Sequence, residues 1–335
     1  MRIAAPSDRP SRRALAALGL VLAAALALPL VASDYVLSVM VLMLFAAYLG
    51  QAWNIMMGYA GLLSIGHALY VGLGAYTAAA LFVHYGLPPW LGMLAGMAVA
   101  SLAGTVIGAL SFRFGLTGVY FALLTIAFAE FTRILFDHFG WVGASSGLFL
   151  PVKSLAHADL VNLRGPPALF YYLMLALVAG ALALSRALIR GRIGFYWQAI
   201  REDQDAAEAL GIDSFRCKLA AVALSAAMTA VAGAIEAFYY NNLYPSSVFA
   251  IGNSVELMSA PIVGGLGTLG GPLVGAFVLT ILGESMTALT SVVHIDGIKQ
   301  WSYGAVLLAI VVLQPDGLWP WLARRLKLAS REPGP

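Results

Sequence analysis

Residues 191–216 read GRIGFYWQAIREDQDAAEALGIDSFR, and this polar stretch divides the chain into two groups of apolar segments. Eight of its 26 residues are charged, whereas only 10% of the whole chain is charged and 61% is hydrophobic. Soluble domains carry about 25% charged residues. The composition therefore indicates an integral membrane protein, and residues 191–216 are expected outside the hydrocarbon core.

The polar stretch also has the pattern of a short helix. Apolar residues recur on one face, and an oppositely charged pair stands one turn apart, a spacing that stabilises helices. Gly211 follows as a residue type that commonly ends a helix. The apolar residues are Ile200, Ala207 and Leu210, and the pair is Arg201 with Asp205. We therefore expect a docking helix displayed in the cytoplasm rather than a plain hydrophilic linker.

Outward from this stretch, eight apolar runs approach the length of about 20 residues that crosses a hydrocarbon core. The runs are 14–32, 35–57, 62–84, 90–111, 116–138, 169–190, 217–240 and 299–314, the last being short. The first run follows two arginines, as in a signal peptide, but its 19 residues exceed the roughly 7–15 of a signal core, so we expect it to be retained. The sequence predicts an all-α polytopic protein, with residues 1–335 forming a single transmembrane domain.

Basic residues predict the orientation, because they accumulate in short cytoplasmic loops. If both termini lie in the cytoplasm, 15 of the 19 lysines and arginines fall on the inner side. Those 15 are Arg2, Arg9, Arg12, Arg13, Arg113, Arg186, Arg190, Arg192, Arg201, Arg216, Lys218, Arg324, Arg325, Lys327 and Arg331. Both termini are therefore predicted to be cytoplasmic, and residues 139–168 to form an external loop.

A ninth apolar region, residues 254–284, differs from the others. The orientation requires it to cross the membrane an even number of times, yet 31 residues are fewer than the roughly 40 that two crossings need. Its middle, from Pro261 to Pro272, is rich in glycine. Because irregular backbone at membrane depth persists only beside protein or a watery cavity, we expect a broken or re-entrant pair of half-helices facing the interior of an assembly. The alternative is one long, tilted helix with a glycine-rich kink.

Enzymatic chemistry is poorly supported by the sequence. Gly265, Gly267 and Gly270 have the spacing of a dinucleotide-binding fingerprint, but that motif requires a βαβ unit, and these glycines lie in an apolar region of bilayer length. The phosphate-binding pattern GxxxxGK[ST] does not occur, so ATP would have to bind to a partner. The single cysteine, Cys217, excludes an internal disulfide, and no Cys/His cluster has metal-ligand spacing. A membrane-embedded enzyme is therefore the least favoured class.

A few ionisable residues fall within the apolar runs. Glu130 and Arg133 stand one turn apart, where an unpaired charge would cost about 2.5–3.5 kcal/mol. We expect a buried ion pair whose members neutralise each other; contact with a zwitterionic substrate or with a partner helix is the alternative. Glu236, Glu256 and Glu284 lie towards helix ends or in the broken region, where they could form a proton pathway or be hydrated.

Four motifs give the chain a resemblance, over nearly its whole length, to the permease subunits of branched-chain amino acid ABC importers. The motifs are GYAGLLSIGH at 58–67 with GLGAY at 72–76, GVYFALLT at 118–125, AIRED at 199–203 through ALGI at 209–212, and GGLGTLGGP at 264–272. The resemblance implies the ABC importer permease fold. Residues 191–216 look like the ATPase-docking loop of these permeases, although the Leu-Pro pair that often follows elsewhere is missing here. The docking residues implied are Arg201, Asp205, Ala206, Ala207, Glu208, Leu210 and Gly211.

The resemblance further implies one half of a transmembrane pore in a bacterial inner membrane. Its partners would be a second, homologous permease subunit, two ATP-binding subunits and an external solute-binding protein, with membrane lipid around them and no nucleic acid. The subunit itself would hold no cofactor, because ATP would be bound by the partners.

The expected substrate, leucine, isoleucine or valine, also rests on the resemblance. A zwitterion with an aliphatic side chain can pass a mainly apolar pore if its charged ends meet a few polar groups. From their membrane position we expect Ser64, Thr117, Tyr120 and Asn253 on this path, together with Gly265 and Gly267 of the broken segment. The alternatives are an ABC permease for urea, short amides or other amino acids, and a proton-coupled secondary transporter.

Overall fold

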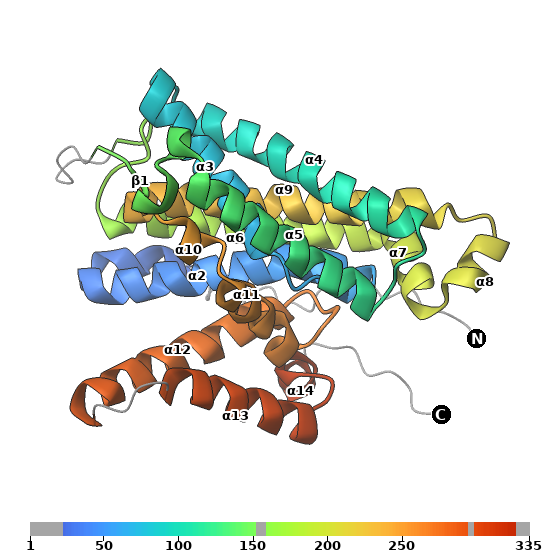
Figure 1. Ribbon diagram of the computed structural model, residues 1–335. Coiled ribbons are helices and arrows are strands. Elements are labelled where there is room, and N and C mark those ends of the chain that lie inside the picture. Colours follow the sequence, from blue (N-terminus) through green and yellow to red (C-terminus); the bar gives the residue numbers. More distant parts are fainter. Residues whose placement is uncertain (1–22, 152–158, 294–297, 326–335) are drawn as a thin grey trace.

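The computed structural model describes residues 23–151, 159–293 and 298–325 (Figure 1). Within them, eight helical segments are long and apolar enough to cross a membrane, which confirms the all-α polytopic fold. These segments are Asp34–Tyr59, Ala68–Tyr85, Pro89–Arg113, Val119–His138, Pro167–Arg190, Ser214–Tyr240, Pro245–Gly264 and Gly271–Leu289. Residues 14–22 of the first apolar run, 14–32, lie outside the described residues.

The elements follow one another along the chain as helices joined by short connections. In order they are η1 (Leu28–Leu30), α2 (Asp34–Asn54), η2 (Ile55–Tyr59), α3 (Ala68–Tyr85), α4 (Pro89–Arg113), α5 (Val119–His138), η3 (Gly140–Val142), η4 (Ala144–Ser146), β1 (Leu148–Phe149), α6 (Pro167–Arg190), α7 (Arg192–Glu202), α8 (Gln204–Ala209), α9 (Ser214–Tyr240), β2 (Asn242–Leu243), α10 (Pro245–Val248), α11 (Ile251–Gly264), α12 (Gly271–Val293), α13 (Ile298–Leu313) and α14 (Leu318–Arg325).

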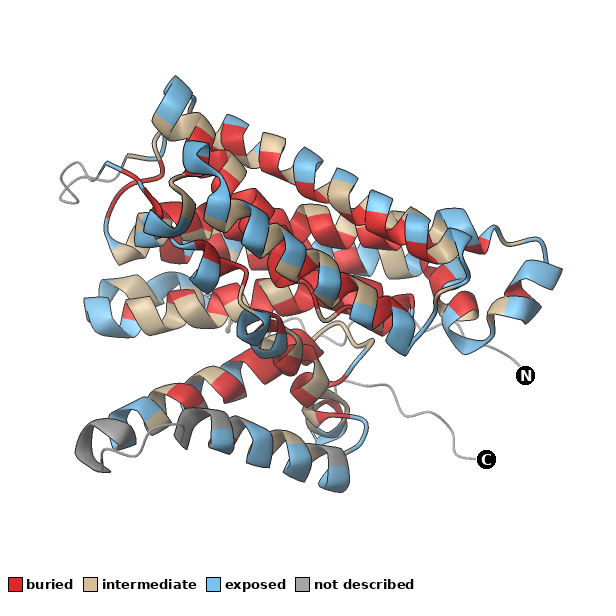
Figure 2. Ribbon diagram, in the orientation of Figure 1, coloured by how far each residue is buried: buried red, intermediate tan, exposed pale blue. Residues whose placement is uncertain are grey.

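The core of the bundle is formed by α3 and α9, which are buried along most of their length (Figure 2). Their backbones approach so closely that a Cβ atom on Gly74 would lie 2.2 Å from the Ala230 carbonyl oxygen, and one on Gly233 would lie 2.0 Å from that of Val71. Helix α4 packs on both helices, with Gly92 facing Ala78 of α3. The small residues therefore allow close helix packing within the subunit.

One end of the bundle, which we call the docking end, carries α7 and α8, the C-termini of α4 and α6 and the N-terminus of α9 (Figure 1). The other end carries the residues after α5 and a two-stranded antiparallel sheet in which Leu148 pairs with Leu243. Basic residues gather at the docking end, as the orientation argument requires. Those in described elements are Arg113, Arg186, Arg190, Arg192, Arg201, Arg216, Lys218, Arg324 and Arg325.

The broken segment is present, but its limits differ from the expected 254–284. Helix α11 has 14 residues and α12 has 23, and residues 265–270 connect them. At 1.5 Å per residue, α12 is about 34 Å long and can cross a bilayer, whereas α11 alone, at about 21 Å, reaches a crossing length only together with α10, as the candidate span Pro245–Gly264. The two helices pack together, because a Cβ on Gly275 would lie 1.8 Å from the Ala260 carbonyl oxygen. The segment is thus two packed helices joined by residues 265–270, and not one kinked helix.

A second irregular stretch lies between α2 and α3. Helix α2 ends in η2, a π-helical turn, and residues 60–67 then run without helical structure to the start of α3. Wider π turns are rare and often occur at functional positions. Both irregular stretches, 60–67 and 265–270, lie next to residues of the docking segment, as the contacts below show.

Candidate functional site

The docking segment, residues 191–216, folds as two helices rather than as the continuous helix expected. Helix α7 ends at Glu202, and α8 begins at Gln204. Between them, Asp203 is extended, with φ −157° and ψ 109°, and its carboxylate accepts a hydrogen bond from the Ala206 amide at 3.0 Å. This N-cap starts a new helix in a different direction, so Arg201 pairs with Glu202, at 3.0 Å, and not with Asp205.

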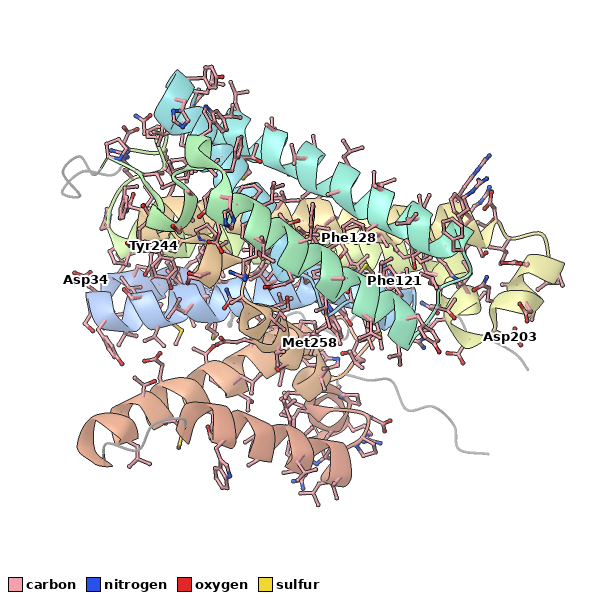
Figure 3. The ribbon with its side chains drawn as sticks, in the orientation of Figure 1. Asp34, Phe121, Phe128, Asp203, Tyr244 and Met258 are labelled. Atoms are coloured by element: carbon pink, nitrogen blue, oxygen red, sulfur yellow. The ribbon has the colours of Figure 1, made fainter. Side chains whose placement is uncertain are left out.

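Helix α8 and the residue after it project at the tip of the docking end, beyond Asp203 (Figure 3). Leu210 is 84% exposed, and Asp205, Ala206 and Glu208 are exposed beside it. Ala207, in contrast, is only 2% exposed, so it faces the subunit and not a docking partner. The surface of α8 therefore presents one large apolar side chain among small residues and carboxylates.

Gly211 ends α8, as expected from the sequence. Its φ is +86°, a left-handed conformation that favours glycine, and its amide donates to the Glu208 carbonyl at 2.9 Å. A Cβ atom at this position would have no heavy atom within 4 Å. Glycine is therefore required here for backbone conformation and not for space.

Side-chain hydrogen bonds hold α8 against the start of α9. The Glu208 carboxylate accepts from the Ser214 hydroxyl and from the Gln204 amide, the latter at 2.8 Å. These two bonds, the Ser214 bond first, hold the pKa of Glu208 below its usual value. Lys218 donates to the Gln204 side-chain oxygen from the next turn of α9. The base of the docking helix is thus fixed by polar contacts, while its tip stays exposed.

Arg201 and Asn54 connect the docking segment to both irregular stretches. The Nη1 atom of Arg201 donates to the Gly58 carbonyl in η2 at 2.5 Å. The Oδ1 atom of Asn54 accepts from the Gly267 amide at 2.9 Å, and its Nδ2 atom donates to the Thr268 carbonyl at 3.0 Å. We call these five residues the docking-end junction.

The glycine-rich residues 265–270 are also packed against the end of the chain. A Cβ atom on Gly265 would lie 2.9 Å from the Asp316 carbonyl, and one on Gly270 would lie 2.7 Å from the Trp319 ring. Gly265 and Gly267, expected on the translocation path, therefore lie at the docking end between η2 and α14.

Ser64, also expected on the path, lies inside the subunit. It is 1% exposed, and its hydroxyl bonds the Nδ1 atom of His67 at 3.1 Å. The Nε2 atom of His67 bonds the Ser225 hydroxyl at 3.0 Å, and Ser225 donates to the Ala52 carbonyl at 2.7 Å. Thr125 of α5 accepts from the amide of Gly66 at 3.2 Å. These bonds satisfy the polar groups of residues 60–67 within the subunit, as irregular backbone at membrane depth requires.

Helix α5 carries an ionic triad in place of the expected buried pair. Arg133 contacts Glu130 at 2.6 Å and, on its other side, Asp137 at 2.7 Å. The side chains of Arg133 and Glu130 are 26% and 41% exposed in the subunit, so the pair is only partly buried there. Asp137 was missed, although its i+4 spacing from Arg133 is visible in the sequence. With two carboxylates and one guanidinium, the triad has an excess of one negative charge.

The remaining path residues are exposed. Thr117 and Tyr120 lie at the start of α5, towards the docking end, and Tyr120 is 70% exposed. Asn253 lies in the first turn of α11, where its amide donates to the Ser247 carbonyl at 2.7 Å. Helices α10 and α11 contact α5, and Phe249 between them packs on Phe136 with ring centroids 5.1 Å apart. Thr117, Tyr120 and Asn253 are thus carried by two neighbouring elements, whereas Ser64 is enclosed.

The exposed faces of α4 and α5 differ in character. Between its ends α4 exposes only aliphatic side chains: Leu91, Leu94, Ala98, Val99, Leu102, Val106 and Leu110. Helix α5 exposes large apolar residues as well, but the Glu130 carboxylate lies beside them, about 17 Å along a helix of about 30 Å.

The other carboxylates of the apolar runs occupy separate places. Glu284 of α12 accepts from the Tyr35 hydroxyl at 3.1 Å. Glu236 lies in α9 and Glu256 in α11, close enough for their charges to interact. Glu284 thus has a hydrogen-bond partner in α2, whereas Glu236 of α9 interacts with Glu256 of α11.

The chain is similar in sequence to known transport permeases. The family described as "Branched-chain amino acid transport system / permease component" matches residues 35–314. The high-affinity branched-chain amino acid transport system permease protein LivM of Escherichia coli (strain K12) is 28% identical over 327 residues, which cover 91% of this chain and 75% of that protein. LivM of Salmonella typhimurium is 29% identical over 304 residues, 84% of this chain and 69% of that protein.

A shorter similarity extends to a second type of permease. The high-affinity branched-chain amino acid transport system permease protein LivH of Escherichia coli (strain K12) is 28% identical over 137 residues, which cover 41% of this chain and 42% of that protein. The match to the family model includes the candidate spans from residue 35 onwards and the docking segment.

Proposed function

The chain belongs to the family of permease components of branched-chain amino acid transport systems, and from this premise we propose that it forms one half of the translocation pathway of an ATP-driven importer for leucine, isoleucine or valine. The observation that carries the proposal is the displayed α8 at one end of a bundle of eight membrane-spanning segments. A transport subunit needs such a surface if another protein supplies the energy. The role is transport and not catalysis.

Two ATP-binding subunits are the proposed partners of α8. The exposed Leu210 would enter an apolar groove, and the carboxylates beside it would fix the orientation by charge. Because the sequence has no GxxxxGK[ST] motif, ATP would bind entirely to those partners, and this subunit would need no cofactor. The docking end would then lie in the cytoplasm, with both termini, in a multi-pass protein of the bacterial inner membrane.

A second permease subunit, homologous to this one, is the proposed partner of the face formed by α5, α10 and α11. A charged group in contact with lipid at the bilayer centre costs about 2.5–3.5 kcal/mol, so the side of α5 that carries Glu130 and Arg133 is expected to face protein or water. Asn253 lies on the neighbouring α11. The aliphatic face of α4 has no such residue and suits lipid. The pathway would run between the two subunits along α5 and α11.

An external solute-binding protein is the proposed partner of the opposite end. There His84 stacks on Trp141 with ring centroids 4.7 Å apart, and its Nε2 atom donates to the Trp141 carbonyl at 2.8 Å. Trp141 is itself exposed, within the predicted external loop 139–168. Aromatic side chains of this kind contribute much of the binding energy at protein interfaces.

The test is uptake by the complete complex in vesicles. Its own binding protein is added on one side of the membrane, and ATP is present or absent on the side of the ATP-binding subunits. Labelled leucine, urea and a basic amino acid are compared. We expect ATP-dependent accumulation of leucine alone. Uptake of urea and not leucine would keep the importer and change its substrate class, whereas leucine uptake driven by a proton gradient without ATP would favour a secondary transporter.

A further inference from the structure

The side chain of Arg201 points away from the docking surface. It leaves the last turn of α7 towards η2, where Nη1 donates to the Gly58 carbonyl at 2.5 Å. Its stem lies over Gly61, since a Cβ atom there would be 2.8 Å from the Arg201 Cγ atom. The Nη2 atom bonds Glu202 at 3.0 Å, which holds the guanidinium in place from the α7 side. Among the docking residues predicted from the sequence, Arg201 is thus directed at the membrane-spanning part.

The same guanidinium lies against residues 265–270. A Cβ atom on Gly267 would be 2.9 Å from the Arg201 Nη1 atom and 2.8 Å from the Gly58 carbonyl oxygen. Asn54 completes the contact, because its amide bonds both Gly267 and Thr268. Three segments far apart in the sequence, α7, η2 and residues 265–270, therefore meet at one point.

Two of these segments are places where membrane-spanning helices are interrupted. The π turn η2 leads into residues 60–67 and then α3, and residues 265–270 join α11 to α12. Residues 60–67 are bonded in turn to Thr125 of α5, and Ser254 of α11 accepts from the Ala68 amide at 2.8 Å. A displacement of α7 at Arg201 would thus act on the connections that lead to α5 and α11, and would do so through fixed polar contacts rather than through a flexible loop.

We propose that Arg201 is the positioning residue that transmits movement of the docking segment to η2 and to residues 265–270, and so keeps transport coupled to ATP hydrolysis in the partners. This inference rests on the proposed function. Arg201 touches neither substrate nor ATP in this role. Arginine suits it because the planar guanidinium has several donors in a fixed arrangement, and a charged donor strengthens the bond to a carbonyl.

The test is the number of leucine molecules imported per ATP hydrolysed, measured with the complete complex in vesicles. A defect in folding or assembly lowers both rates together and leaves this ratio unchanged. Arg201→Ala is expected to lower the ratio about tenfold, a factor that corresponds to about 1.4 kcal/mol, while the ATPase subunits remain bound. Arg201→Lys, which retains one donor, is expected to give an intermediate ratio.

Arg186→Ala is the matched control, because Arg186 is exposed near the same end but lies on α6, outside the docking segment. Its ratio should equal that of the unmodified complex. An unchanged ratio in Arg201→Ala would overturn the inference even if both rates fell, and so would loss of the ATPase subunits, which would make Arg201 a docking contact. An unmodified complex that imports no leucine with ATP would contradict the proposed function and this role with it.

Discussion

Replacing Arg133 with alanine is expected to damage the subunit more than removing either of its acidic partners. Arg133 stands between Glu130 and Asp137, with contacts of 2.6 and 2.7 Å. Removing Glu130 or Asp137 leaves one neutral pair, whereas removing Arg133 leaves two carboxylates and no cation within the triad. The sequence alone predicts equal effects for Glu130 and Arg133, because it treats them as an isolated pair.

The magnitude follows from the position of the triad. A single uncompensated charge at the centre of a membrane helix costs about 2.5–3.5 kcal/mol on insertion scales. Glu130 and Arg133 are 41% and 26% exposed in the subunit, so water or a partner reduces that cost. We therefore expect Arg133→Ala to lower the amount of folded protein several-fold, the effect that a modest loss of stability has in cells.

The assay is the amount of subunit recovered in the assembled complex after mild detergent extraction, normalised to synthesis. Arg133→Ala should give the least, Glu130→Ala and Asp137→Ala should stay close to the unmodified protein, and the double change Glu130→Ala with Arg133→Ala should recover part of the loss. Arg133→Lys keeps the charge and serves as the control. If Glu130→Ala proved as harmful as Arg133→Ala, or if all three assembled normally but lost uptake, charge compensation would not be the reason for the triad.

Four further predictions concern the docking segment and the start of α9. Leu210→Asp should leave thermal stability unchanged, because the side chain is 84% exposed, yet release the ATPase subunits during purification; retained subunits would show that α8 is only a solvated turn. Gly211→Val should lower stability by about 1–2 kcal/mol through its left-handed backbone, whereas Gly211→Asn should cost less; equal losses would contradict a backbone cause. The bond from Ser214 is the first cause of the lowered pKa of Glu208. The ionised carboxylate therefore stabilises the fold above the ordinary carboxyl pKa, and this stabilisation is lost as pH falls through the lowered value. The difference in stability between the unmodified protein and Glu208→Gln should shrink on acidification, and a constant difference would refute the linkage. Cys217, at the start of α9, should react with a membrane-impermeant maleimide in inside-out vesicles only, and labelling in intact cells would reverse the predicted orientation.

Composition and run lengths were enough to predict the membrane-spanning architecture. Each apolar run from 35 onwards corresponds to a helix, because about 20 apolar residues leave few alternatives in lipid. The glycine-rich residues 264–272 were recognised as a break, since helix interiors at membrane depth rarely contain so many glycines. The limits of the broken segment were wrong because apolar sequence does not mark where a helix begins inside the bilayer, and Ile251 at the start of α11 has no capping side chain.

The direction of side chains was less predictable than the helices. Helical spacing placed Ala207 and Leu210 on one face, but the N-cap at Asp203 starts a new helix, so Ala207 is buried and Leu210 exposed. An aspartate such as Asp203 is a recognisable signal for the start of a helix, because its carboxylate can accept from the amide three positions later. Here that signal competes with the continuous helical pattern of the flanking residues. The contacts of Arg201 with Gly58 could not be predicted at all, because 143 residues separate the two and only tertiary packing brings them together.

The non-helical residues 60–67 leave the ribosome well before the side chains that satisfy them. Gly66 bonds Thr125, 59 residues later, and His67 bonds Ser225, 158 residues later. At a synthesis rate of about 5–20 residues per second, His67 precedes Ser225 by about 8–30 s. Thr125 of α5 follows Gly66 after only about 3–12 s at this rate, but His67 lacks its partner until α9 is made, so the stretch is expected to remain until then in the hydrated interior of the insertion machinery. Helices α2 and α3 would then be released into lipid only after α9 has been made, and a chain shortened before α9 should be held at the insertion site and degraded there.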